Sequence, residues 1–199
     1  GSPEGLSSSA LWLADGNQTD SSFGSSVSTA GDVNADGYSD VIVGSPGYDN
    51  DDVNGGRVYV YAGSPEGLSS SAVWIAEGSQ TASSFGSSVA TAGDVNADGY
   101  SDVIVGAPGY DTSNLNAGKA YVYHGSPAGL SSGSPWVTET TQPDAGLGFS
   151  VSTAGDVNGD GYSDVIIGAH TYDNGEVGEG QALVYLGSAE GLSPNAAWT

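Results

Sequence analysis

Short apolar runs alternate along this chain with clusters of Gly, Ser, Asn, Asp and Pro. Clusters of these residues form turns, so an apolar run between two of them is typical of a β-strand. No segment keeps the 3.6-residue spacing of apolar positions that marks an amphipathic helix. The pattern therefore predicts an all-β protein with little helix.

Four strands are expected in each unit of this pattern. In the first unit they lie at residues 24–30, 39–44 and 57–62, and from 74 to 76. Along the third strand Val58 and Val60 face one way, and Tyr59 and Tyr61 face the other. Because both faces are apolar, we expect neighbours on both sides of the sheet. Stacked four-stranded antiparallel sheets are typical of β-propeller blades, and a solenoid is the alternative.

The whole pattern recurs every 62 residues. The segment Gly-Ser-Pro-Glu-Gly-Leu begins at Gly1 and Gly63, and variants begin at Gly125 and Gly187. Tryptophan recurs with the same step, at positions 12, 74, 136 and 198. The chain thus holds three full periods followed by 13 residues that repeat its beginning. Because it starts inside a period and shows no signal peptide, we expect further sequence upstream in the parent protein.

One nonapeptide, Asp-Val-Asn-x-Asp-Gly-Tyr-Ser-Asp, occurs in all three periods and is the most specific motif of the chain. Calcium takes about six to eight oxygen ligands at about 2.3–2.6 Å. The side chains at positions one, three and five converge if the chain curls, and glycine at position six permits the curl. The seventh residue offers its backbone carbonyl, and the ninth closes the sphere with both carboxylate oxygens. The expected ligands are Asp32, Asn34, Asp36, Tyr38 and Asp40; Asp94, Asn96, Asp98, Tyr100 and Asp102; and Asp156, Asn158, Asp160, Tyr162 and Asp164.

Other readings of the motif fit less well. An EF-hand closes with Glu at position twelve and is flanked by helices, whereas here the closing Asp is followed at once by a strand pattern. Magnesium prefers a smaller shell that retains water, and zinc or copper would require His or Cys. A metal-free, Asp-rich turn is the simplest alternative, but three intact copies weigh against it. We therefore predict three Ca²⁺ ions per chain.

The charge of the chain agrees with a cation as partner. Asp and Glu number 24 against 2 Lys plus Arg, giving a formal net charge of −22. Such a chain cannot build the basic patch that nucleic acid requires, and anionic membrane surfaces repel it. Cysteine is absent, and no apolar run is long enough to span a membrane, so we expect no membrane insertion.

Catalytic motifs are not evident. The two histidines, His124 and His170, occupy unequal places in the repeat and suggest no metal pair or triad. No Gly-x-Ser-x-Gly segment lies between a strand and a helix, and the closest carboxylates belong to the proposed calcium loops. We therefore expect a protein that is not an enzyme.

The repeat resembles the FG-GAP repeat of integrin α-subunit propellers and their bacterial relatives. The first copy carries Phe23-Gly24 and Gly44-Ser45-Pro46, the second Phe85-Gly86 and Gly106-Ala107-Pro108, and the third the variants Leu147-Gly148 and Gly168-Ala169-His170. The resemblance implies that the inner strand begins near Phe-Gly and that the Trp strand is the outer edge of a blade. It implies blades at 21–82, 83–144 and 145–199, the last with a truncated outer strand at 196–199. Residues 1–20 would then be an outer strand belonging to a neighbouring blade.

The resemblance also indicates a function and a location. It favours a non-enzymatic, calcium-binding scaffold or adhesion module from an extracellular or cell-surface parent protein, with a protein or glycan as possible ligand. A lectin-like glycan binder is one alternative, since Trp and Tyr faces suit sugar rings. Propellers close with about four to eight blades. We therefore expect two copies to form a homodimer with a six-bladed ring; a fragment of a larger propeller, with its ligand site elsewhere, is the other alternative.

Overall fold

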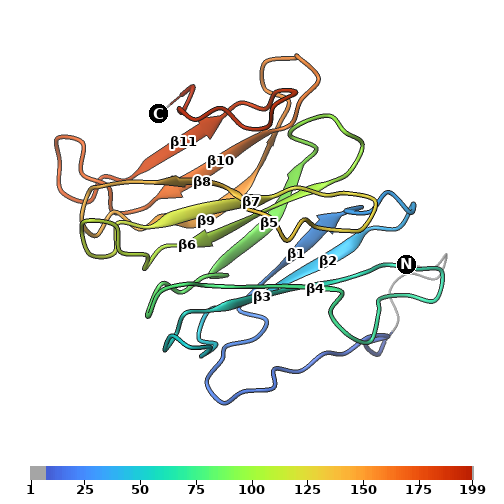
Figure 1. Ribbon diagram of the computed structural model, residues 1–199. Helices are drawn as coiled ribbons and strands as arrows, with labels where there is room; N and C mark the ends of the chain where they lie inside the picture. Colours follow the sequence, from blue (N-terminus) through green and yellow to red (C-terminus); the bar gives the residue numbers. More distant parts are fainter. Residues whose placement is uncertain (1–7, 199) are drawn as a thin grey trace.

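The computed structural model describes residues 8–198, which contain eleven β-strands and no α-helix (Figure 1). No helix that could cross a membrane is found in this range. The strands are β1 Ser26–Gly31, β2 Asp40–Ser45, β3 Arg57–Tyr61, β4 Trp74–Glu77, β5 Ser88–Gly93, β6 Asp102–Ala107, β7 Lys119–Tyr123, β8 Trp136–Glu139, β9 Leu147–Gly155, β10 Asp164–Ala169 and β11 Gln181–Tyr185. The all-β prediction is confirmed.

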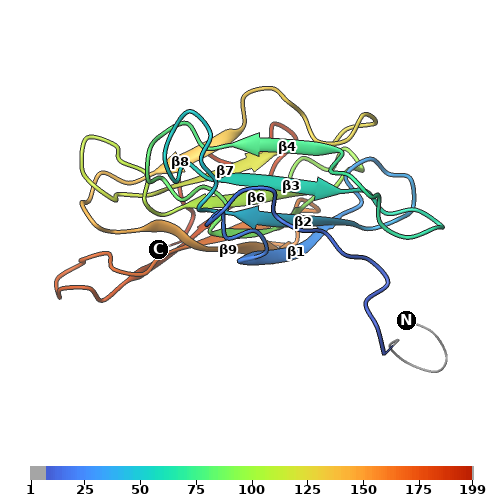
Figure 2. The same cartoon turned by 90° about the horizontal axis from the view of Figure 1, so that it is seen from below.

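The strands form three antiparallel sheets in which each strand pairs with the next along the chain. Their orders are β1-β2-β3-β4, β5-β6-β7-β8 and β11-β10-β9. This simple order arises because turn clusters join consecutive runs, and antiparallel strands need only a short connection. The sheets follow one another from blue through green to red in Figure 1. Among their first strands, β5 contacts both β1 and β9, whereas β4 lies on the opposite side of the molecule (Figure 2). This is the arrangement of three β-propeller blades.

The apolar core lies between the sheets. Val58 and Val60 of β3 pack with Phe85, which precedes β5, and with Val105 of β6, and all four side chains are buried. A second cluster joins the second sheet to the third in the same way, with Val122 among its members. Each face of the second sheet is therefore covered, as the apolar pattern on both sides of its strands predicted.

Tryptophans at the start of the fourth strands fix the outer edge of the stack. Trp74 packs edge-on against Tyr123 of the next sheet, with ring centroids 4.9 Å apart. Trp136 contacts Tyr185 of the third sheet at 5.0 Å in the same geometry. The equal step of 62 residues between the tryptophans is thus explained by repeated packing between sheets.

The two ends of the chain differ from the repeat. Residues 8–20 form no strand, yet Trp12 packs on Tyr61 at 4.8 Å, as Trp74 does on Tyr123. The predicted outer strand at 1–20 also includes residues 1–7, which lie outside the described residues. In the third sheet the fourth strand is reduced to a single bridge between Val184 and Trp198. The blade limits at 21–82, 83–144 and 145–199 stay predictions.

Candidate metal sites

Each nonapeptide forms the connection between the first two strands of its sheet. The loops therefore lie at equivalent places, between β1 and β2, β5 and β6, and β9 and β10. The glycine at the sixth position is left-handed in all three, with φ of 92° at Gly37, 93° at Gly99 and 93° at Gly161. Residues with a Cβ resist this conformation, so glycine at this position allows the predicted curl.

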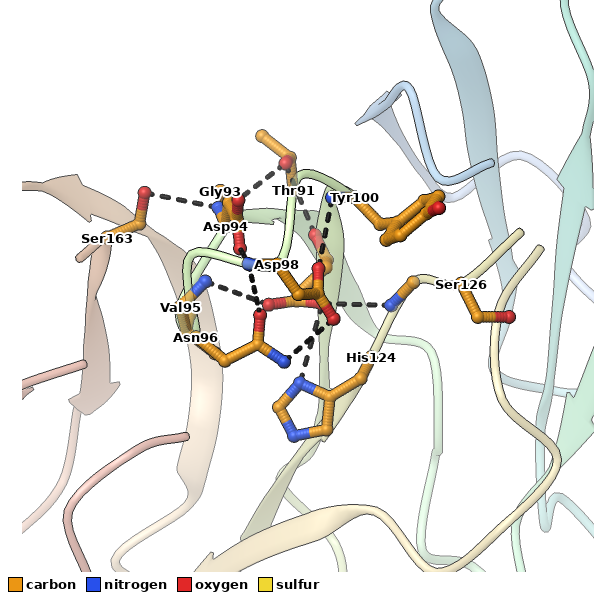
Figure 3. Close-up of polar contacts among 12 residues, drawn as sticks. Thr91, Gly93, Asp94, Val95, Asn96, Asp98, Tyr100, His124, Ser126 and Ser163 are labelled. Carbon is orange, nitrogen blue, oxygen red and sulfur yellow. Dashed lines mark hydrogen bonds and ion pairs between the residues drawn. The ribbon is translucent and has the colours of Figure 1, made fainter. Parts of the chain in front are cut away.

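Hydrogen bonds within the curl bring the first three ligand positions together. In the second loop the Asp98 N–H donates to Asp94 Oδ1 and to Asn96 Oδ1, both at 3.1 Å (Figure 3). The Gly99 N–H donates to Asp94 Oδ2 at 2.8 Å, and Asn96 Nδ2 donates to Asp98 Oδ2 at 3.0 Å. The Tyr100 N–H in turn donates to Asp98 Oδ1 at 3.0 Å. One short turn thus carries all of these oxygens.

The other two loops repeat this network. The Asp36 N–H lies 3.0 Å from both Asp32 Oδ1 and Asn34 Oδ1. In the third loop the Asp160 N–H donates to Asp156 and Asn158 at 3.0 Å. The backbone N–H groups of the third loop, that of Gly161 foremost, lower the pKa of Asp156. The remaining predicted positions, Tyr38 and Tyr162, donate their N–H groups to Asp36 and Asp160.

The closing aspartate of each loop is fully buried, unlike the others. Asp102 accepts the Val95 N–H on Oδ2 at 2.8 Å and the Gly125 N–H on Oδ1 at 2.9 Å. Asp40 likewise accepts the N–H groups of Val33 and Gly63, and Asp164 accepts those of Val157 and Gly187. A carboxylate oxygen has room for a second partner, so these contacts leave lone pairs for a metal.

Burial and neighbouring charge together raise the pKa of the closing aspartate in the first loop. Burial raises the pKa of Asp40, the N–H groups of Gly63 and Val33 oppose the rise, and the charges of Asp36 and Asp32 add to it. A cation bound in the loop would favour the ionised form of such a carboxyl group. The loop is thus suited to a positive ligand.

The donor set fits calcium. Every proposed ligand offers oxygen, from carboxylate, amide or backbone carbonyl, which is the chemistry that calcium prefers. Within residues 8–198, however, no group of three or more His, Cys, Asp or Glu side chains is arranged to hold a metal. The ligands are assembled on one loop, but their carboxylates face backbone N–H groups. Calcium binding would need these side chains to turn toward one point.

The two histidines differ in their surroundings. His124 Nδ1 lies 3.4 Å from Asp102 Oδ1, too far for a good hydrogen bond. The contact with Asp102 nevertheless raises the pKa of His124, against the opposing effect of burial. His170 stacks on Phe149 with ring centroids 3.9 Å apart. Both are packing contacts present in one copy of the repeat alone.

Serines of the following sheet hold the first two loops in place, and the loop motif did not predict these contacts. The Ser101 N–H donates to the Asp32 carbonyl at 3.0 Å, and the Asp32 N–H donates to Ser101 Oγ at 3.2 Å. Ser163 holds Asp94 with the same two bonds, one of which is drawn in Figure 3. The only signal in the sequence was the strict recurrence of serine at the eighth position of the motif.

The model of the FG-GAP repeat matches residues 23–61, 85–123 and 147–185. The chain is 32% identical to integrin alpha-5 of Xenopus laevis over 194 residues, covering 93% of this chain and 18% of that protein. It is 40% identical to a phosphatidylinositol-glycan-specific phospholipase D of Bos taurus over 172 residues, covering 81% of this chain and 20% of the relative. Integrin alpha-6 of Homo sapiens is 37% identical over 158 residues, which cover 79% of this chain and 13% of that protein.

These comparisons agree with the repeat and the fold. The chain spans about a fifth or less of the length of the curated relatives it matches. Each matched segment begins at the Phe-Gly or Leu-Gly pair, contains one complete loop and ends in the third strand of its sheet. The match covers more than half of the chain, and the chain therefore belongs to the FG-GAP repeat family.

Proposed function

We propose that this chain is a non-enzymatic, calcium-binding β-propeller module of the adhesion type. The observation that carries the proposal is the same nine-residue loop in all three sheets, with every expected oxygen ligand present. Integrin relatives support the adhesion role and an extracellular or cell-surface parent protein. A protein ligand fits this role. Two copies closing a six-bladed ring belong to the same proposal, because propellers close with about four to eight blades.

The bound ions would stabilise the folded structure. Without metal, each loop gathers its carboxylates on one turn, and the chain's two basic side chains lie elsewhere: Arg57 pairs with Glu77, and Lys119 pairs with Glu139 at 2.9 Å. Three calcium ions would take the formal charge from −22 to −16, since each adds two. A ligand that binds only the folded state stabilises it by mass action.

The alternatives are weaker. The phospholipase D relatives are enzymes by name, but the matched part is a small share of their length, and the sequence of this chain selects no catalytic group. A lectin-like site would need open aromatic faces. Trp12, Trp74 and Trp136 instead pack against tyrosines, although Trp198 is exposed. Binding on a glycan array would revive this alternative.

Calcium titration by calorimetry tests the proposal. We expect three ions per chain, and two in the variant Asp98→Ala, which loses a ligand of the second loop. The matched control is Asp51→Ala, because Asp51 is an exposed acidic residue outside the loops. It should keep three ions. Equal melting temperatures in calcium and in chelator, for the unaltered chain, would refute the structural role.

A further inference from the structure

The third sheet has an uncovered outer face. We define it by Ala154, Val157, Ile166 and Val184, which correspond to core residues of the first two sheets. Val157 is 58% exposed, whereas its equivalents Val33 and Val95 are 2% and 0% exposed. The difference lies in the neighbour, because the following sheet covers Val33 and Val95. Among the described residues nothing covers Val157 in this way.

The first sheet has the complementary uncovered face, at the other end of the stack. Val27 of β1 is 65% exposed, while Val89 and Val151 at the same position of the other sheets are 6% and 8% exposed. Val89 is buried by the first sheet, and its N–H donates to Ser26 Oγ at 3.0 Å. Each end of the stack thus exposes one half of a contact that the chain makes twice internally.

Glycines show how closely such faces approach. A Cβ placed on Gly44 would lie 2.0 Å from the Gly86 carbonyl oxygen of the next sheet, and one on Gly106 would lie 1.9 Å from that of Gly148. At Gly168, the equivalent of both, the nearest atom is 3.6 Å away and belongs to Ser150 of the same sheet. The third-sheet face therefore keeps the glycine that close packing requires, without a neighbour against it.

The third calcium loop is incomplete for the same reason. Ser101 holds Asp32, and the Ser126 N–H donates to the Val33 carbonyl at 3.1 Å; Ser163 and Ser188 serve the second loop in the same way. No residue in the described range makes these bonds to Asp156 or Val157. By the 62-residue step, their partners would be equivalents of Ser39 and Ser64, which belong to the first sheet.

We propose that a second copy of this chain docks head to tail, with its first sheet covering the third sheet and its Ser39 and Ser64 holding Asp156 and Val157. The contact continues the two interfaces seen inside the chain, so its chemistry is already present on both faces. Repeating it at the other ends closes a ring of two copies. This inference rests on the proposed function and deepens it, because the third calcium loop is then completed only by the partner copy.

Electrostatics oppose this contact unless cations are bound. Each copy has a formal charge of −22, so two copies repel each other over a Debye length of about 10 Å at 0.1 M salt. Calcium in the loops lowers this charge and fixes the segment that the partner's serines must meet. We therefore expect association to be stronger in calcium than in chelator.

Sedimentation velocity in calcium tests the contact from both sides. The unaltered chain should sediment as a dimer, with twice the chain mass of 19.7 kDa. Val27→Asp alters the first-sheet face, and Gly168→Ala adds a methyl group to the third-sheet face; each should raise the dimer dissociation constant about tenfold or more. Val137→Asp changes an exposed valine of the middle sheet and Gly133→Ala an open loop glycine, so these matched controls should stay dimeric.

Mixing the two face variants tests the direction of docking. A Val27→Asp chain keeps an intact third sheet and a Gly168→Ala chain keeps an intact first sheet, so the mixture restores one good contact. The mixture should therefore associate more strongly than either variant alone. A contact between two identical faces would leave one of the two variants fully dimeric, which would overturn the head-to-tail arrangement.

A cross-linking measurement covers the case in which a face variant folds poorly. The chain has no cysteine, so a Ser64→Cys, Val157→Cys double variant carries only the two introduced thiols. A short thiol-reactive cross-linker should join two copies, and neither single variant should be joined to the same extent. A monomeric unaltered chain, or no cross-link in the double variant, would overturn this inference. Loss of calcium binding with the dimer intact would instead refute the calcium proposal alone.

Discussion

Asp102 combines two tasks that are separable by mutation. Its carboxylate is a proposed calcium ligand, and it also satisfies the buried N–H groups of Val95 and Gly125. Removing the acceptor leaves two buried donors unpaired, at a cost of about 1–3 kcal/mol each. The exposed Asp98 has the first task and no buried donors to satisfy.

The variant Asp102→Ala should therefore lose about 2–6 kcal/mol of unfolding free energy even in chelator. Asp98→Ala should lose far less unfolding free energy in chelator, and its main loss of unfolding free energy should appear in calcium. Urea unfolding monitored by tryptophan fluorescence measures both. Equal destabilisation of the two variants in chelator would contradict the structural task of Asp102.

Tyr123 should make the fold sensitive to alkaline pH. Burial raises its pKa to about 12, above the value of about 10 in an unfolded chain. Because the folded state favours the protonated phenol, this contribution to stability is complete below about pH 10 and is lost as pH rises through about 12. Tyr123→Phe should remove this part of the pH dependence, on the order of 2–3 kcal/mol. Unfolding free energies measured from pH 9 upward for both proteins would show it; an unchanged slope in the variant would argue against it.

At the level of elements, turn chemistry was enough to place the strands to within a few residues. The first strand was expected at 24–30 and is Ser26–Gly31, because the left-handed Gly24 keeps the chain in a turn. The fourth was expected to end at Ala76 and reaches Glu77, which pairs in register with Arg57 and forms an ion pair with it. Side-chain contacts between strands determine where these strands end, and a local sequence pattern does not predict such contacts.

The local sequence was enough to predict where the proposed metal loops lie, but not which residues support them. Asp94, Asn96 and Asp98 lie within five consecutive residues, so a local motif reveals them. Ser163 lies 69 residues from Asp94, and it meets the loop only because the sheets stack. The motif thus identifies the proposed ligands, while the stacking of the sheets decides which residues hold the loop.

The glycine near the end of the second strand of each sheet provides a test of sheet stacking. Gly106→Ala would put a methyl group 1.9 Å from the Gly148 carbonyl oxygen, so the second and third sheets must move apart. Overpacking of this kind costs about 1–3 kcal/mol. Gly168→Ala should leave the unfolding free energy of the isolated chain nearly unchanged, since its methyl group would make only an ordinary contact with Ser150, 3.6 Å away. Urea unfolding at low protein concentration compares the two; similar losses would mean that the third sheet is covered after all.

At the scale of the whole molecule, the proposed ring would make Trp12 and Trp198 compete for the same tyrosine. Trp12 already packs on Tyr61, as Trp74 packs on Tyr123 and Trp136 on Tyr185. In a head-to-tail ring, Trp198 of one copy would reach for the same Tyr61 of the other. Trp198 bridges to Val184 and is otherwise exposed, so it is free to be displaced.

Truncating one end of the chain should therefore strengthen the dimer, and truncating both ends should weaken it. Removing residues 196–199 leaves Trp12 alone at Tyr61, and removing residues 1–14 leaves Trp198 alone there, so either truncation should tighten the dimer. Removing both segments leaves Tyr61 without an aromatic partner and the third sheet without an outer strand, so that dimer should be weaker than the unaltered one. Sedimentation velocity across a concentration series gives the order of the dissociation constants. If each single truncation weakened association, the two segments would have separate places, and the ring would need another arrangement at its outer edge.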